Sequence, residues 1–145
     1  MSLSKYFSLP ELVVSQSAAR RGLKNIPFGK QLENLKQTAQ RMDAIREMLG
    51  KPVLVSSGYR NAEVNALVGG SKTSAHLQGL AVDFTCPGYG NPLAVAKAVL
   101  AMGIEFDQLI HEYGAWVHIG FAEAGKPSRK QTLTINKRGT QMGLL

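Results

Sequence analysis

The 145 residues, of which 44% are hydrophobic and 19% charged, suit one soluble domain, and we expect a single domain over residues 1–145. One cysteine, Cys86, excludes an internal disulfide framework, and no apolar stretch reaches the roughly 20 residues needed for insertion into a membrane. The net charge of +7 favours a polyanionic partner, but no aromatic residues interleave the basic ones, so nucleic acid is not expected.

The N-terminal third of the chain is predicted to be helical. Ser8-Leu9-Pro10-Glu11 has the form of a capping box and predicts a short helix. Asn25 to Gly29, a segment that includes Pro27, is predicted to be a loop. Six apolar residues then recur at three- and four-residue spacing and predict a long amphipathic helix that ends at Gly50: Leu32, Leu35, Ala39, Met42, Ile45 and Leu49. This helix should form the main helical wall of the core.

The rest of the chain is predicted to be mostly strands. Five segments are expected to be strands: Val53–Val55, Leu80–Cys86, Phe106–Tyr113, Trp116–Phe121 and Gln131–Asn136. The third and fourth are expected to form a hairpin around Gly114-Ala115, and the last is expected to be an edge strand. Helical segments are expected over Asn61–Val68 and from Asn91-Pro92 to Gly103. Helices followed by strands with short connections predict an α+β fold, with N-terminal helices packed on a small, mainly antiparallel sheet.

Three residues have the types and spacing of a metal site. His76 and Asp83 lie seven residues apart, with Gly79 between them and Asp83 on a predicted strand. His118 lies in the middle of a later predicted strand. Imidazole nitrogen and carboxylate oxygen both bind zinc, and a catalytic zinc site takes three protein ligands and leaves one position for water. Each histidine taken alone is also compatible with a satisfied core or surface residue, and the native metal is left open.

The residues around these three resemble a known family. The motif Ser-x-His-x-x-Gly-x-Ala-x-Asp begins at Ser74, between Ser57-Gly58-Tyr59-Arg60 and Trp116-Val117-His118. Together with Phe7-Ser8-Leu9-Pro10-Glu11-Leu12 and with Asn65, Gly69 and Gly70, it resembles the zinc D-Ala-D-Ala carboxypeptidases, which share the hedgehog/DD-peptidase fold. The similarity is to the short phage and prophage branch, related to L-alanyl-D-glutamate endolysins. It covers about residues 7–121 and leaves a basic C-terminal extension over residues 122–145.

The resemblance implies the roles of seven residues: zinc binding by His76, Asp83 and His118, and substrate binding by Arg60, Ser74, Tyr59 and Trp116. Arg60 suits a substrate carbonyl or carboxylate because a guanidinium stays charged and can donate two parallel hydrogen bonds. A surface salt bridge is the alternative for Arg60, and a local turn-stabilising role is the alternative for Ser74. Tyr59 and Trp116 either line the pocket or belong to the core.

The general base is the point at which the sequence departs from the family. Better-known relatives carry an acidic residue three positions before the last histidine, and here that position is Ala115. If the hairpin loop has three residues, Glu112 pairs with Trp116 and shares the face of His118. If the loop has two residues, His111 takes that place instead. We predict Glu112 as the base, with His111 as the alternative.

From the resemblance, we expect a zinc peptidase that cleaves peptidoglycan stem peptides, as a D-Ala-D-Ala carboxypeptidase or an L-Ala-D-Glu endopeptidase. The expected setting is phage or prophage lysis by a monomer. The chain would be made in the cytoplasm without a signal peptide and released to the cell wall by a holin. The rival prediction, favoured by Ala115, is a non-catalytic, zinc-stabilised module that binds cell wall or belongs to a phage tail.

Overall fold

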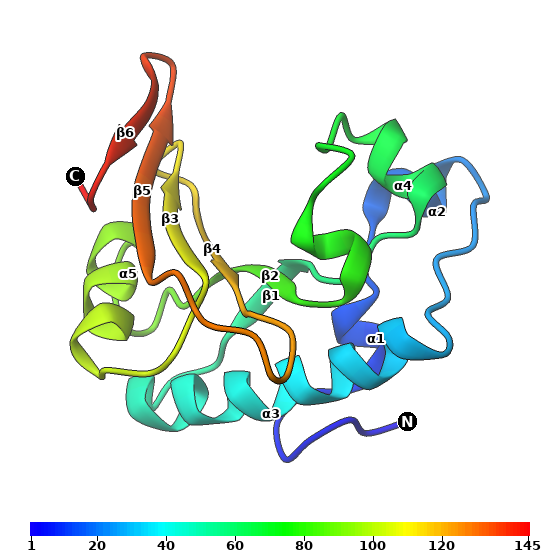
Figure 1. Cartoon of the computed structure of the whole chain (residues 1–145), viewed down its shortest axis with the longest axis horizontal. Helices are drawn as coiled ribbons and strands as arrows, with labels where there is room; N and C mark the ends of the chain where they lie inside the picture. The colour runs from blue at the N-terminus through cyan, green and yellow to red at the C-terminus, as the bar shows by residue number, and fades with distance from the viewer.

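The computed structural model describes residues 1–145 and is built around one six-stranded sheet (Figure 1). The strands in chain order are β1 (Leu54–Ser57), β2 (Ala81–Thr85), β3 (Gln108–Glu112), β4 (Trp116–Gly120), β5 (Gln131–Asn136) and β6 (Gly139–Met142). Across the sheet their order is β1-β2-β4-β3-β5-β6, and every pairing is antiparallel except the parallel one between β3 and β5. The α+β class and the mainly antiparallel sheet are confirmed.

Five α-helices and one short 3₁₀ helix complete the fold. They are α1 (Leu9–Leu12), α2 (Gln16–Arg20), α3 (Lys30–Leu49), α4 (Ala62–Leu67), the 3₁₀ helix η1 (Ala75–Gln78) and α5 (Pro92–Ala101). The capping box at Ser8 and the end of α3 at Gly50, in the left-handed conformation, are both as predicted. Helix α2 was not predicted, because a single turn is too short to show apolar periodicity. None of these helices combines the length and the apolar character needed to cross a membrane.

The core lies between the sheet and the two longest helices. Along β2 and β4, alternate residues point to opposite faces. One set faces the core and joins apolar residues of α3 and α5 in a single cluster, which includes Val82, Phe84, Val117, Ile119, Leu35, Met42, Ile45, Val95 and Val99. The other set faces the opposite side of the sheet, toward the part of the molecule that holds η1 and α4 (Figure 1). That second face carries the polar residues discussed below.

The C-terminal segment differs from the prediction. Gln131–Asn136 is a strand, as expected, but it lies inside the sheet between β3 and β6 and does not form its edge. The edge is β6, which follows the turn at Lys137-Arg138. Three of its four residues are exposed, and its sequence has no apolar alternation that could have predicted it. The basic segment after Phe121 therefore continues the same sheet.

Candidate metal centre

His76, Asp83 and His118 come together at the centre of the polar sheet face. Asp83 on β2 and His118 on β4 are direct cross-strand partners, so their side chains point to the same side. His76 reaches them from η1. One ligand atom from each residue lies within 4.8 Å of the others, and the three residues are only 3%, 7% and 8% exposed. The structure therefore brings the three predicted metal ligands into one buried cluster.

Helix α3 holds the turn that carries His76. The side-chain hydroxyl of Thr38 donates to the carbonyl of Gly79 at 2.7 Å, and the amide of Asn34 donates to the carbonyl of Gln78 at 2.9 Å. Both donors are buried side chains of α3. Gly79 ends η1 at φ +73°, in the left-handed region. The turn lets the chain pass from His76 into β2, and so it sets the distance between His76 and Asp83.

We predict that Gly79→Ala destabilises the fold by about 2–5 kcal/mol in chemical denaturation, and that it weakens metal binding. A left-handed backbone costs an alanine roughly 1–2 kcal/mol. Here the added Cβ would also lie 2.6 Å from the backbone oxygen of Gln31 on α3. Gly69→Ala is the matched control, because Gly69 has φ +72° and no atom within 4 Å of the added Cβ. Equal losses in the two variants would show that the contact with α3 contributes nothing.

The hydrogen bonds of His76 test whether a metal fits the cluster. Its Nδ1 lies 2.7 Å from the carbonyl oxygen of Gly58, which can only accept, so Nδ1 carries the proton. In the neutral ring, Nε2 then presents a lone pair to Oδ1 of Asp83 at 3.2 Å. A cation between two acceptors at that distance would satisfy both of them. Two imidazole nitrogens and one carboxylate oxygen are a donor set that suits zinc and leaves a fourth position free.

The surroundings of His76 and Asp83 favour the protonation states in which these two side chains bind a metal. Burial lowers the pKa of His76, against the opposing effect of Asp83, and so disfavours a second proton on its ring. Burial would raise the pKa of Asp83, but the hydrogen bond from His118 and the second neighbouring imidazole outweigh it and hold that pKa far below its usual range. A neutral imidazole and an ionised carboxylate are the forms that bind divalent metals.

Arg60 contacts the cluster from the β1 side. Its Nη2 lies 3.5 Å from Oδ2 of Asp83, while Nε donates to Ser57 Oγ and Nη1 donates to Asn65 Oδ1, both at 3.1 Å. Arg60 does form an ion pair, as the alternative predicted, but the pair does not lie on the surface: its side chain is mostly buried and its partner is Asp83. A guanidinium has five N–H donors, so two remain available to a ligand.

Glu112 lies on the same side of the sheet as His118. The hairpin has the three-residue loop, with Glu112 paired with Trp116 and Ile110 paired with His118. His111 pairs with Val117 and points to the opposite face, where its Nδ1 lies 3.1 Å from the carbonyl oxygen of Leu145. The carboxylate of Glu112 makes no hydrogen bond or ion pair. Burial and the charge of Asp83 raise the pKa of Glu112, while His118 and Arg60 oppose that rise.

The other three predicted substrate contacts differ in their surroundings. Ser74 caps η1, its hydroxyl accepting from the backbone N–H of His76 at 3.2 Å, and it also lines a pocket beside His118. Trp116 is half-buried, and its indole N–H is the one buried side-chain polar atom without a partner. Tyr59 belongs to the core cluster and is 4% exposed, so it offers almost no surface to a substrate. The structure gives Tyr59 a packing position.

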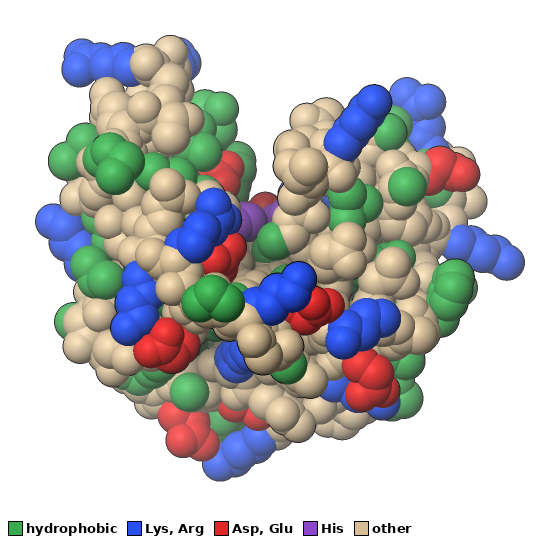
Figure 2. Space-filling model, in the orientation of Figure 1, with side chains coloured by type: hydrophobic (Ala, Val, Ile, Leu, Met, Phe, Trp, Pro, Cys, Tyr) green, Lys and Arg blue, Asp and Glu red, His purple; other side chains and the backbone are tan.

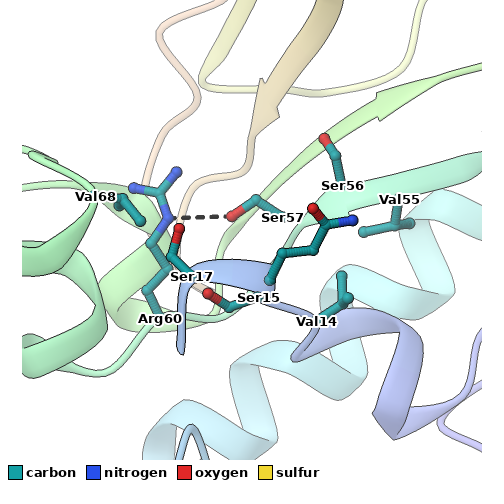
Figure 3. Close-up of a pocket in the computed structure, with 9 residues that line it drawn as sticks. Val14, Ser15, Ser17, Val55, Ser56, Ser57, Arg60 and Val68 are labelled. Atoms are coloured by element: carbon teal, nitrogen blue, oxygen red, sulfur yellow. Dashed lines mark hydrogen bonds between the residues drawn. The ribbon is translucent and has the colours of Figure 1, made fainter. Parts of the chain in front are cut away.

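Two pockets flank the buried cluster. One, of about 430 Å³, lies on the β1 side, and Figure 3 shows Arg60 hydrogen-bonded to Ser57 in it, among Ser15, Ser17 and Ser56. The other, of about 420 Å³, opens on His118 from the β3 side. Figure 2 shows a notch between the two halves of the molecule, with histidine surface at its base.

Some site residues could not be found from the sequence. Arg129 lines the β3-side pocket from the C-terminal segment, whose sequence showed only basic charge, and Asp107 lines the same pocket. The carbonyl of Gly58, which orients His76, is a backbone group and cannot be recognised from the pattern of side chains.

A protein-family model described as peptidase M15 matches residues 5–120. No curated protein matches the chain.

Proposed function

The chain belongs to the peptidase M15 family and has the hedgehog/DD-peptidase type of fold, and from this premise we propose that it is a zinc-dependent peptidase of bacterial peptidoglycan stem peptides. The observation that supports the proposal best is the buried cluster of His76, Asp83 and His118 on the polar face of the sheet. Its hydrogen bonds leave two acceptors facing each other, and the family chemistry supplies a cation for that place.

The proposed role of each residue follows from the surroundings of its side chain. His76, Asp83 and His118 would hold zinc, which when bound polarises a carbonyl and lowers the pKa of a coordinated water to about 7. Glu112, free of other partners and half-buried, would accept a proton from the attacking water and return it to the leaving amine. Arg60 would fix the carboxylate of Asp83 and use its remaining N–H groups on the substrate.

Two finer points belong to the same proposal. The bond that is cut would be L-Ala-D-Glu or D-Ala-D-Ala, and Ser74 and Trp116 would contact the peptide on either side of it. The setting would be phage or prophage lysis, with a monomer acting on the cell wall after holin-mediated release. The net charge of +7 supports this setting because bacterial walls are polyanionic.

Digestion of purified peptidoglycan, with zinc supplied, tests the proposed function. We expect new amino termini to appear and mass spectrometry of the muropeptides to show a single type of cleaved bond. Loss of the C-terminal D-alanine identifies a carboxypeptidase, and release of peptides that begin with D-glutamate identifies an endopeptidase. No new amino termini from fully metal-loaded protein would contradict the peptidase function.

A non-catalytic cell-wall module is the second candidate, and the alanine at position 115 favours it. In that case the zinc site would serve folding alone. The candidate predicts that the loaded protein sediments with purified peptidoglycan but leaves its composition unchanged. The digestion and a sedimentation assay on the same preparation therefore separate the two functions.

A further inference from the structure

The pocket on the β3 side of the metal centre is built almost entirely from polar residues. It includes Ser71, Thr73 and Ser74 from the segment that leads into η1, and Gln108 from β3. His118 forms part of its wall. A group that occupies this pocket therefore lies next to the position at which a peptide bond would be cut.

Arg129 is the one lysine or arginine that lines this pocket. It comes from the segment between β4 and β5, beyond the residues that match the family model. Asp107 holds it through three hydrogen bonds: Nε to Oδ1 at 3.0 Å, Nη2 to Oδ2 at 2.7 Å, and the backbone N–H to Oδ1 at 3.2 Å. Asp107 is itself fixed, because its backbone N–H donates to the carbonyl of Gly120 at 2.8 Å. The guanidinium is therefore held along one edge by a carboxylate whose own backbone is bonded to β4.

The outer edge of this guanidinium is free. Asp107 occupies the edge formed by Nε and Nη2, whereas Nη1 makes no hydrogen bond in the protein. The side chain is 60% exposed. An arginine has two edges that can each bind a carboxylate with parallel hydrogen bonds, so the Nη1–Nη2 edge can receive a second one. Because Asp107 already balances the charge of Arg129, we expect the paired N–H donors of the Nη1–Nη2 edge, more than net attraction, to select the ligand.

We propose that this pocket is a substrate subsite in which Arg129, positioned by Asp107, binds a carboxylate of an acidic peptide beside the cleaved bond. The identity of the ligand as a peptide rests on the proposed peptidase function. A stem peptide offers two such carboxylates, the α-carboxylate of D-glutamate and the C-terminal carboxylate of D-alanine. Both would meet the same guanidinium edge.

Three synthetic peptides test the subsite. They are L-Ala-γ-D-Glu-L-Lys-D-Ala-D-Ala with both carboxylates free, the same peptide with the D-glutamate α-carboxylate converted to the amide, and the same peptide with the C-terminus converted to the amide. Affinity is measured by calorimetry in the Glu112→Gln background, and kcat/KM is measured in the chain with Glu112. Each measurement is repeated with Arg129→Gln. Lys126→Gln is the control, because Lys126 carries the same charge, pairs with Glu123 and does not line the pocket.

We expect one of the two amides to bind about 10-fold more weakly than the free peptide when Arg129 is present, and equally well in Arg129→Gln. The amide that loses affinity identifies which carboxylate is bound. Comparing peptides on the same variant removes any effect of incomplete folding. Lys126→Gln should keep the full preference.

The outcomes separate the subsite from the peptidase function. Binding that depends on Arg129 and on a carboxylate, without cleavage, would leave the subsite standing and overturn the peptidase. Cleavage with a preference that Arg129→Gln does not change would overturn the subsite alone. Equal binding of all three peptides, or no binding of any, would also overturn the subsite.

Discussion

Glu112→Gln should abolish peptide hydrolysis while leaving the metal in place. The carboxylate of Glu112 shares the sheet face of His118 and has no hydrogen bond or ion pair of its own. It is close enough to Asp83, His118 and Arg60 for their charges to act on its pKa. An amide of the same shape cannot accept a proton, and loss of a general base typically lowers kcat by about 10²–10⁴-fold. The measurements are the rate of release of amino groups and the zinc content of the variant.

His111→Gln is the matched control for this prediction. His111 is the neighbouring residue on β3, but it pairs with Val117 and points to the opposite face. The activity of the His111→Gln variant should therefore stay close to that of the unchanged chain. A Glu112→Gln variant with an unchanged rate, or a His111→Gln variant that loses activity, would show that the proton passes through a different residue. An equal loss of zinc and activity in Glu112→Gln would indicate a structural role.

Asp83→Ala should remove the metal, the activity and part of the stability at once. Oδ1 of Asp83 lies beside both histidines, at 3.2 Å from His76 Nε2 and 2.8 Å from His118 Nδ1. Loss of a residue that only orients a ligand commonly costs 10- to 100-fold in metal affinity, so loss of the ligand itself should cost more than roughly 100-fold. Without Asp83, the mostly buried guanidinium of Arg60 also loses its counter-charge, which typically destabilises a fold by about 3–5 kcal/mol.

A double variant separates these two consequences. Asp83→Ala with Arg60→Met removes the uncompensated charge, so unfolding in urea with a chelator present should show much of the lost stability restored. The double variant should still bind no metal and have no activity. Metal content is measured by mass spectrometry of the digested protein. An Asp83→Ala variant that retains one zinc per chain and unfolds at the same urea concentration would contradict both roles of Asp83.

Most of the local elements and the candidate ligand pair His76 and Asp83 could be predicted because their signals are local. The capping box at Ser8, the apolar spacing along α3 and the asparagine caps of α4 and α5 each involve residues within a few positions of one another. The pair His76 and Asp83 has the same property, since one tight turn separates the two residues. Short-range hydrogen bonding and the periodicity of apolar residues are enough to predict these features from the sequence.

The residue pattern alone left open which of Glu112 and His111 shares the sheet face of His118, although the family resemblance favoured Glu112. Alternate residues of a strand face opposite sides, so a change of one residue in the loop length exchanges the two candidates. The chain settles on the three-residue loop, in which Tyr113 adopts φ +55° and Gly114 adopts φ +64°. A positive φ at a tyrosine is not encoded in any simple pattern of residues. The register of β3 against β4 is therefore a tertiary result.

The sequence by itself determined most of the helices and strands and, through the family resemblance, the three side chains that could hold a metal. The tertiary structure decided which face each strand presents, that β5 lies inside the sheet, that Tyr59 packs in the core, and that Arg129 and Asp107 meet beside His118. The physical reason is the range of the interactions. Caps and periodicity act within one or two turns, whereas strand register and the pairing of Asp107 with Arg129 depend on contacts between distant segments, for which the residue pattern carries no separate signal.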